Sequence, residues 1–333
     1  MIESIEFKNF KALRDTTLPL SRFTLIVGPN GSGKSTALQA FSALHGPGQS
    51  QFIQSRSAGA SKSTPVSLTA KWREEGNNCI IAVQWADDIA SGPAFTASFQ
   101  NRLQDLKRPR TALDRCRFFA LEAGAIAAPV PLVPHIQLAH NGANLAVVLD
   151  RLRDVNPELF VELNEQLGRW IPEFDQVLFE TPQPGYRSIS LRTRSGGYRI
   201  PADQLSQGTL IALALLTIAW LPEPPSIICL EEPDHGLHPR LLREVRDALY
   251  RLANPDSAQE KREPVQVVAT THNPYFLDLF REHPEEIVIA EKVGLDATFS
   301  RLSDRSDLEE NLGDAPLSEV WYSGVLGGVP AGT

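Results

Sequence analysis

The sequence predicts an α/β fold with a mixed central sheet, an antiparallel β subdomain and a helical lobe. Largely apolar runs at 23–27, 226–230 and 265–269 lead into a glycine-rich motif, two carboxylates and a Thr-Thr-His segment, as expected for buried strands that end at the ligand edge of an open α/β sheet. Alternating runs, which predict antiparallel strands, lie at 66–72, 78–85 and 94–99. Apolar residues at helical spacing across 143–174 predict the helical lobe.

Composition excludes several classes of protein. The 333 residues are 42% hydrophobic and 22% charged, which is ordinary for a globular chain. No apolar run reaches the roughly 18 residues of a membrane helix, and no signal pattern opens the chain, so we expect a cytoplasmic protein without a membrane segment. The odd cysteine count and the absence of CxxC argue against a disulfide framework or zinc ribbon. Because the net charge is -8, nucleic-acid contacts would need local basic patches.

The first motif is GPNGSGKS at 28–35, which matches GxxxxGK[ST] at every fixed position. An apolar strand precedes it, and a helix with Leu38, Phe41 and Leu44 on one face follows. A loop between strand and helix directs backbone N–H groups and the positive helix end at one point, which suits a triphosphate. Lys34 would neutralise phosphate, and the Ser35 hydroxyl would bind Mg²⁺. The alternative is a plain glycine-rich turn. Such a turn would not need a preceding strand together with a lysine and a hydroxyl residue at the fixed positions of the motif, so the phosphate loop is favoured.

A second motif joins an apolar strand to two carboxylates, Glu231 and Glu232, in IICLEEP. An acidic residue at the end of a strand beside the phosphate loop would lie near Mg²⁺. The next carboxylate could orient or deprotonate an attacking water. Adjacent acids are more often a solvated face, but the apolar run leading into them disfavours that interpretation.

The segment LSQGTLIALALL places Ser206 as the N-cap of an apolar helix, followed by the small Gly208. This helix end is a second potential anion site. One ATP would not need two such ends from one chain, but a symmetric dimer would use both. A well-capped core helix is the alternative. Downstream, VVATTHNP places His272 at the end of a strand, where a neutral imidazole could hydrogen-bond the γ-phosphate or the attacking water.

Together these motifs resemble the ATPase heads of the ABC, SMC and RecF class. The short motifs EEP, GLHP and THNP are most similar to those of the RecF/OLD-type AAA ATPases of bacteria. The resemblance implies an ABC-type P-loop head that binds ATP and Mg²⁺. It gives Glu231 the Walker B metal role, Glu232 the role of catalytic base and His272 that of switch histidine. Ser206 and Gly208 would serve the partner's ATP. The residues implied to hold phosphate and Mg²⁺ are Gly28, Asn30, Gly31, Gly33, Lys34, Ser35 and Thr36.

Some positions depart from the pattern of that class. Gln207 stands where glycine is usual in LSGGQ, Glu231 replaces Asp, and His238 holds the aspartate position of the D-loop. No Q-loop glutamine is assigned; Gln51, Gln54 and Gln84 are candidates. Near the N-terminus, the resemblance gives an adenine-side role to Asn9, Phe10 and Lys11.

The motif order predicts one ATPase domain over 1–333. Its expected parts are a Walker A and antiparallel β lobe (1–118), an inserted helical and β lobe (119–204), a core with signature, Walker B, D-loop and switch histidine (205–305) and a tail (306–333). No heptad pattern fills the gap between the Walker A and signature motifs, so no long coiled coil is expected. The roughly 60 residues after His272 are too few for the Toprim nuclease domain of OLD proteins.

Two basic groups are candidate DNA or partner surfaces, near Arg102–Arg117 and Arg187–Arg199, although such runs are usually solvated faces. We expect an ATP-hydrolysing protein that forms a homodimer in the ATP state. By resemblance, it would switch a DNA-linked process, repair or phage defence, through a partner nuclease or other effector. The alternatives are the ATP-binding subunit of an ABC transporter and a nucleotide-sensing regulator.

Overall fold

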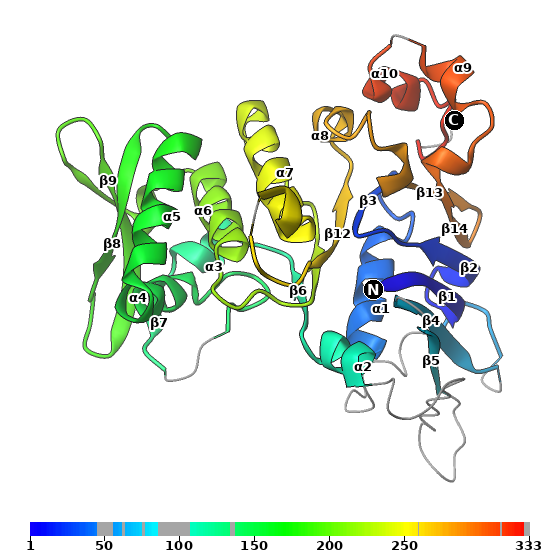
Figure 1. The fold of residues 1–333 in the computed structure, drawn as a ribbon, viewed down its shortest axis with the longest axis horizontal. Helices are drawn as coiled ribbons and strands as arrows, with labels where there is room; N and C mark the ends of the chain where they lie inside the picture. Colours follow the sequence, from blue (N-terminus) through cyan, green and yellow to red (C-terminus); the bar gives the residue numbers. More distant parts are fainter. Residues whose placement is uncertain are drawn as a thin grey trace. The chain divides into compact units, whose positions relative to one another are not determined.

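A computed structural model describes residues 1–44, 56–61, 64–74, 77–85, 107–133, 137–258, 260–313 and 315–329 (Figure 1). The chain forms two compact units, and each is assembled from separate stretches of sequence. Unit 1 contains residues 1–118, 225–231 and 262–333, and unit 2 contains residues 119–224 and 232–261. Among the described residues, no helix is both long and apolar enough to cross a membrane.

The centre of unit 1 is a six-stranded sheet in the order β14-β13-β3-β12-β11-β6. Its strands are β3 (Phe23–Val27), β6 (Cys116–Phe119), β11 (Ile227–Leu230), β12 (Gln266–Thr271), β13 (Ile287–Val293) and β14 (Asp296–Arg301). Strands β13, β3, β12 and β11 are parallel, whereas β14 runs antiparallel to β13. Every residue of β3, β11 and β12 is buried, which explains their continuous apolar runs. The predicted mixed sheet is confirmed.

A four-stranded antiparallel sheet forms the second layer of unit 1, in the order β2-β1-β4-β5. Its strands are β1 (Ile2–Phe10), β2 (Leu13–Pro19), β4 (Val66–Glu74) and β5 (Asn77–Trp85). Helix α1 (Lys34–Leu44) packs against both sheets, because Leu38 and Phe41 join one buried cluster with Phe7 and Val268. The strands predicted at 66–72 and 78–85 are confirmed, and the run at 94–99 lies outside the described residues. The β1–β2 hairpin was not predicted.

Short helices complete unit 1: α2 (Lys107–Asp114), α8 (Pro274–Asp278), α9 (Leu308–Leu312) and α10 (Leu317–Tyr322). Two hydrogen bonds join α10 to α8, since the Ser318 backbone N–H and hydroxyl donate to the Asp278 carboxylate at 2.7 and 2.6 Å. The tail after β14 is therefore attached to the segment that follows β12. Within the described ranges, 3₁₀ turns lie at Ala202–Gln204, Pro255–Ala258, Pro284–Glu286 and Leu302–Asp304.

Unit 2 stacks a small antiparallel sheet on helices, with α5 between strand β8 and helix α6 (Figure 1). Its elements are α3 (Ala123–Ala127), β7 (Val130–Pro131), α4 (Leu145–Val155), α5 (Pro157–Trp170), β8 (Phe174–Glu180), β9 (Tyr186–Thr193), β10 (Arg199–Pro201), α6 (Gln207–Ala219) and α7 (Pro239–Ala253). Strands β9 and β10 pair as an antiparallel hairpin.

One aromatic residue joins three helices of unit 2. Trp220, at the end of α6, donates its indole N–H to Glu162 of α5 at 2.8 Å. The Arg251 guanidinium of α7 lies 4.2 Å from the centre of the Trp220 ring. Because α6 is buried along almost its entire length, these contacts hold an apolar helix between two amphipathic ones.

Candidate functional site

The predicted phosphate loop, Walker B residue and switch histidine leave neighbouring strands at the same edge of the central sheet. Strand β12 pairs with β3 through Thr271 and Val27 and with β11 through Ala269 and Leu230. The chain continues from these strands into Gly28, Glu231 and His272. Since carboxyl ends of parallel strands form the ligand-binding edge of α/β sheets, this edge is the candidate nucleotide site.

The phosphate loop closes around the ammonium group of Lys34. This side chain is 6% exposed and donates to the carbonyl oxygens of Gly28 and Pro29 at 2.7 and 2.9 Å. A Cβ atom at Gly28 would lie 2.3 Å from the Ala290 carbonyl oxygen of β13, so only glycine fits there. Gly33 has a φ of +92°, which also favours glycine. Asn30 and Gly31 are exposed at the tip of the loop.

The residues present fit a triphosphate with Mg²⁺. The Ser35 hydroxyl donates to Glu231 Oε1, so the two predicted metal ligands are in direct contact. Mg²⁺ typically takes one or two protein oxygen ligands together with phosphate oxygens and waters. The Ser32 hydroxyl is buried and has no hydrogen-bond partner among the described residues, which leaves a donor for a phosphate oxygen. Ser32 was missed from the sequence because it occupies a variable position of the motif.

Glu232 has an unusual backbone conformation. Its φ of +44° lies in the left-handed region, which costs a residue with a side chain about 1–2 kcal/mol. Its carbonyl accepts the His235 N–H at 2.9 Å, which closes a turn directly after β11. Backbone strain of this kind concentrates at functional sites, which is consistent with the predicted role of this carboxylate.

The signature segment (204–209) and the D-loop (234–239) both lie in unit 2. Ser206 caps α6, because its hydroxyl accepts the Thr209 N–H at 3.1 Å. Ser206 and Gln207 are nevertheless exposed. His238 accepts the Arg240 N–H on Nδ1 at 3.2 Å and thereby caps α7. The histidine at the D-loop position therefore has a structural role as a helix cap.

His272 is exposed at the end of β12. The next residue, Asn273, accepts the Tyr275 N–H at 3.0 Å and caps α8, while its own N–H donates to the Thr271 hydroxyl at 3.0 Å. These two bonds fix the backbone on one side of the histidine and leave its ring at the candidate edge of the sheet.

The weak adenine-side candidates lie at the end of β1. Asn9 and Lys11 have positive φ values of 61° and 51°, and Phe10 is buried between them. The Asn9 side chain donates to the Thr64 carbonyl at 3.2 Å, so it holds the loop before β4. Lys11 donates to Gln39 of α1 at 2.6 Å. Among the Q-loop candidates, Gln51 and Gln54 lie outside the described residues, and Gln84 is exposed on β5.

In the first basic group, Arg102 lies outside the described residues, and Arg108 and Arg110 are exposed on α2. Arg115 is exposed next to β6. Arg117 is half-buried and donates to the Cys116 and Asp114 carbonyls at 2.7 and 3.3 Å. In the part of this group that the structure describes, the exposed arginines are therefore Arg108, Arg110 and Arg115.

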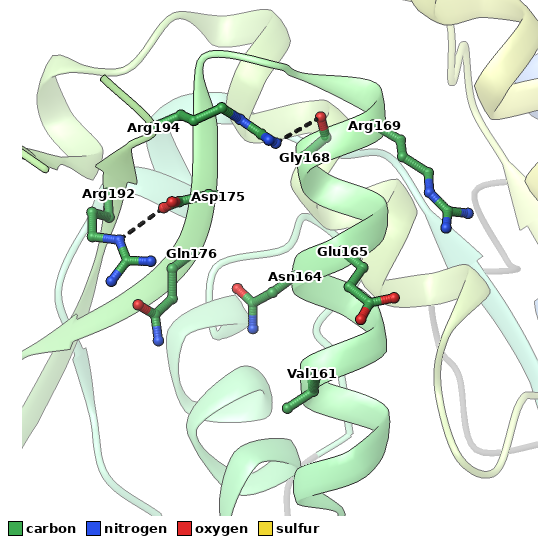
Figure 2. Close-up of a pocket in the computed structure, with 9 residues that line it drawn as sticks. All are labelled: Val161, Asn164, Glu165, Gly168, Arg169, Asp175, Gln176, Arg192 and Arg194. Carbon is green, nitrogen blue, oxygen red and sulfur yellow. Dashed lines mark hydrogen bonds and ion pairs between the residues drawn. The ribbon is translucent and has the colours of Figure 1, made fainter. Parts of the chain in front are cut away.

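The second basic group lies beside a pocket of about 740 Å³ between α5 and strands β8 and β9 (Figure 2). Arg192 pairs with Asp175 at 2.8 Å, and this guanidinium lowers the pKa of the carboxyl below its ordinary value. Arg194 donates to the Gly168 and Pro172 carbonyls at 3.3 and 3.1 Å. Arg187 pairs with the buried Asp150 at 2.8 Å. Arg199 remains exposed. Internal partners thus engage three of the four predicted arginines, which weakens this group as an anion-binding surface.

Comparison with known proteins agrees with this geometry. A family model described as "AAA ATPase domain" matches residues 1–103. A second, described as "AAA domain, putative AbiEii toxin, Type IV TA system", matches residues 130–278. Among solved structures, the SMC head bound to the C-winged helix domain of ScpA has a TM-score of 0.62 at 15% identity and covers 90% of this chain and 96% of that one. These matches support an ABC/SMC/RecF-like AAA ATPase head, with the fold seen in SMC heads.

The chain is also similar to two further proteins. The SMC head domain from Thermotoga maritima has a TM-score of 0.51 at 17% identity, covering 90% of this chain and 98% of that one. A protein named OLD nuclease, from Thermus scotoductus (strain ATCC 700910 / SA-01), is 22% identical over 84% of this chain. The chain spans 60% of the length of that protein. The AAA matches and the OLD relative together support ATPase activity.

Proposed function

We propose that this ATPase head hydrolyses ATP and dimerises head-to-head around two ATP–Mg²⁺, and that this cycle switches a partner effector in a DNA-linked process in the cytoplasm. The observation that carries the proposal is a division of polar groups between the two units. Unit 1 holds the phosphate loop and the Ser35–Glu231 contact, whereas unit 2 holds a capped helix end whose Ser206 and Gln207 are exposed.

The phosphate loop is the proposed ATP site of each chain. The backbone N–H groups of 28–36, with Asn30 and Thr36, would surround the phosphates at the N-terminus of α1. Lys34 would exchange its two carbonyl acceptors for phosphate oxygens, which are stronger partners for an ammonium group. Ser35 and Glu231 would hold Mg²⁺, which neutralises charge on the phosphates when it is bound.

Glu232 is the proposed catalytic base. It directly follows the Walker B residue in the chain, and its carboxylate would accept the proton of the attacking water. His272 would hydrogen-bond the γ-phosphate or that water from the end of β12. In hydrolysis the water oxygen would bond to the γ-phosphorus as the bond from that phosphorus to the oxygen it shares with the β-phosphate breaks. Release of the inorganic phosphate would then remove the charge that held the two heads together.

A second copy would complete the site. The first turn of α6 leaves backbone N–H groups beside the exposed Ser206, and such a helix end favours an anion. In a symmetric dimer, the Ser206 and Gly208 of one chain would contact the γ-phosphate held by the other. Nucleotide state would then set dimer affinity, since ATP contacts both chains only in the closed state.

The decisive experiment uses Glu232→Gln, with Glu244→Gln as a control at an exposed glutamate of α7. We expect Glu232→Gln to bind ATP, to lose hydrolysis by roughly 100-fold or more, and to accumulate as a dimer with Mg-ATP. The control should turn over ATP normally and remain mainly monomeric. Analytical ultracentrifugation and phosphate release measure both properties. A Glu232→Gln protein that stays monomeric at saturating ATP would refute the dimer, and unchanged hydrolysis would refute the base.

DNA is the proposed target, supported by the exposed arginines of α2 and by the nuclease name of the OLD relative. Replacing Arg108 and Arg110 by alanine should weaken duplex binding and reduce the salt slope by about 2. Arg192→Ala is the control, because this guanidinium already pairs with Asp175. Fluorescence anisotropy from 50 to 200 mM salt, with ATP, measures the effect. No binding at low salt would exclude DNA.

A pull-down from native cells with Glu232→Gln and ATP tests the rest of the assignment. Recovery of a nuclease or another effector with DNA supports the proposed switch. Recovery of a membrane protein instead would favour a transporter subunit. ATP binding without turnover by the unmodified chain would favour a nucleotide sensor.

A further inference from the structure

The turn of the β9–β10 hairpin in unit 2 carries an exposed aromatic ring. Tyr198 lies directly before β10 and is 70% exposed. A tyrosine ring presents a flat apolar face, and such faces favour stacking against other flat rings. The surroundings of Tyr198 indicate which kind of ring it would bind.

Hydrogen bonds within the turn fix the backbone that carries this ring. The Tyr198 N–H donates to the Thr193 hydroxyl at 2.9 Å, and the Tyr198 carbonyl accepts the Thr193 N–H at 2.8 Å. The Thr193 hydroxyl in turn donates to the Ser195 carbonyl at 2.9 Å. Gly196 and Gly197 complete the turn with φ values of +83° and +64°, which favour glycine. The ring therefore stands on a closed turn.

One of the two glycines also positions the ring itself. A Cβ atom at Gly196 would lie 2.4 Å from Cε2 and 2.8 Å from Cδ2 of Tyr198. At Gly197, in contrast, nothing lies within 4 Å of the Cβ position. The absent side chain at Gly196 thus lets the ring rest on the turn. A ring held in place before binding loses little conformational freedom when it stacks on a ligand.

The hairpin that presents the ring is strongly basic. Residues 187–201 contain four arginines and no carboxylate. Two of these arginines pair with carboxylates elsewhere in unit 2. Arg194 donates to neutral carbonyl groups, which do not cancel its charge (Figure 2). Arg199 is exposed and directly follows Tyr198 in the chain. Positive charge on both sides of the ring favours a ligand that combines flat groups with anions.

A pocket of about 730 Å³ adjoins the turn. Thr193, which bonds the Tyr198 backbone, lines this pocket together with the apolar side chains of Phe174 and Ile200. Glu173 also lines it, and this carboxylate would repel a phosphate group. The pocket therefore favours an uncharged flat group beside the ring, with the anions of the ligand outside.

We propose that this turn binds the unpaired bases of single-stranded DNA, with Tyr198 as the stacking platform and with Arg194 and Arg199 contacting neighbouring phosphates. Aromatic rings among basic side chains bind single strands, since every base has a flat face and every linkage a negative charge. Bases in a duplex stack on one another, so the site discriminates between single-stranded and duplex DNA. This inference rests on the proposed DNA-linked function and specifies the form of DNA that unit 2 recognises.

The test is Tyr198→Ala in the full chain, measured by fluorescence anisotropy. The probes are a labelled thymidine oligonucleotide of about 12 nucleotides and a duplex of the same length. We expect Tyr198→Ala to weaken binding of the single strand by about 10-fold and to change duplex binding little. Tyr198→Phe should bind the single strand normally, because it keeps the ring. Tyr322→Ala is the matched control, since Tyr322 is 81% exposed on α10 of unit 1.

The two glycines of the turn provide a second, independent pair of variants. Gly196→Ala and Gly197→Ala each place a side chain at a positive φ, so both strain the backbone. Only the Gly196 variant would also displace the Tyr198 ring. We expect Gly196→Ala to reproduce most of the loss of single-strand binding, and Gly197→Ala to lose less.

Arg199→Ala tests the phosphate contact. It should reduce the salt slope of single-strand binding by about 0.7, as expected when one phosphate contact is removed.

A loss that is confined to single strands and rescued by Tyr198→Phe supports the proposal. If the unmodified chain does not bind the oligonucleotide at low salt, or if Tyr198→Ala binds it equally well, the proposal is overturned. Equal losses for single-stranded and duplex DNA also overturn it, because contacts to the phosphate backbone would then explain the binding. In the same titrations, duplex binding that depends on Arg108 and Arg110 tests the proposed DNA target separately.

Discussion

The polar groups at the strand edge of unit 1 are bonded within the chain, whereas several polar residues of the signature segment and the D-loop in unit 2 are exposed. At the strand edge, Lys34 is buried against loop carbonyls, and Ser35 donates to Glu231. In unit 2, Gln207 of the signature segment and His235 of the D-loop are exposed. Ser206 is also exposed, and its hydroxyl caps α6. In the first region, the polar side chains already have hydrogen-bond partners in the same chain. In the second region, polar side chains are exposed to a possible ligand or partner. This difference is what a site completed by another copy requires.

The largest effect should follow from Lys34→Ala, which removes the ammonium group from the phosphate loop of unit 1. Loss of a buried ammonium that can contact two phosphates should weaken ATP binding on the order of 100-fold. Lys292→Ala is the control, because Lys292 is exposed on β13. Isothermal titration with ATP and Mg²⁺ measures the difference. ATP affinity within a few-fold of the unmodified protein would contradict the proposed phosphate role of Lys34.

A second prediction asks whether Ser206 is a helix cap, a ligand, or both. Ser206→Ala should lower the free energy of unfolding by about 1 kcal/mol, because the Thr209 N–H loses its acceptor. Ser206→Asn should restore that stability, since asparagine caps equally well, but its larger side chain should not restore hydrolysis. Urea unfolding and steady-state turnover are compared for both variants. Full turnover in Ser206→Asn would reduce Ser206 to a cap.

The smallest expected effect is a change in the free energy of unfolding at Glu232. This residue begins a unit 2 segment directly after Glu231, the last residue of a unit 1 segment. Glu232→Gly should raise the free energy of unfolding by about 0.5–1 kcal/mol, because glycine accepts a positive φ without strain. Glu232→Ala removes the same carboxylate but cannot relieve the backbone. Both should lose hydrolysis, and chemical denaturation should separate them. Equal stability of the two variants would mean that no strain is stored at this position.

Elements with strong local patterns were predictable from the sequence. The central strands are continuous buried runs, and the phosphate motif fixes its own strand and helix, so both were placed correctly. The β1–β2 hairpin was missed, although Ile5 and Phe7 alternate with less buried residues, because the spacings from Ile2 to Ile5 and from Phe7 to Phe10 are three residues and interrupt the period of two. Strand β8 was missed at its start because the helical interpretation ran to residue 174, whereas α5 ends at Trp170.

Site features that depend on distant contacts were not predictable. Motif spacing placed Ser35 and Glu231 in one site but could not show that they touch, since 195 residues separate them in the chain and only the register of β3, β12 and β11 brings them together. The basic group at 187–199 looked available because its partners, Asp150 and Asp175, lie elsewhere in the sequence. Likewise, nothing local indicates that Gly208 faces Gly236.

The interleaved segments of the two units have a consequence for how the chain acquires its structure. Unit 1 begins at the N-terminus, yet it needs residues 225–231 and 262–333 to complete its central sheet. A nascent chain therefore exposes the edges of β3 until most of the sequence has left the ribosome. Unit 2 can assemble only after residue 261 as well. Such non-local pairing slows folding and leaves early intermediates open to aggregation, so production of this protein should benefit from slow synthesis at low temperature.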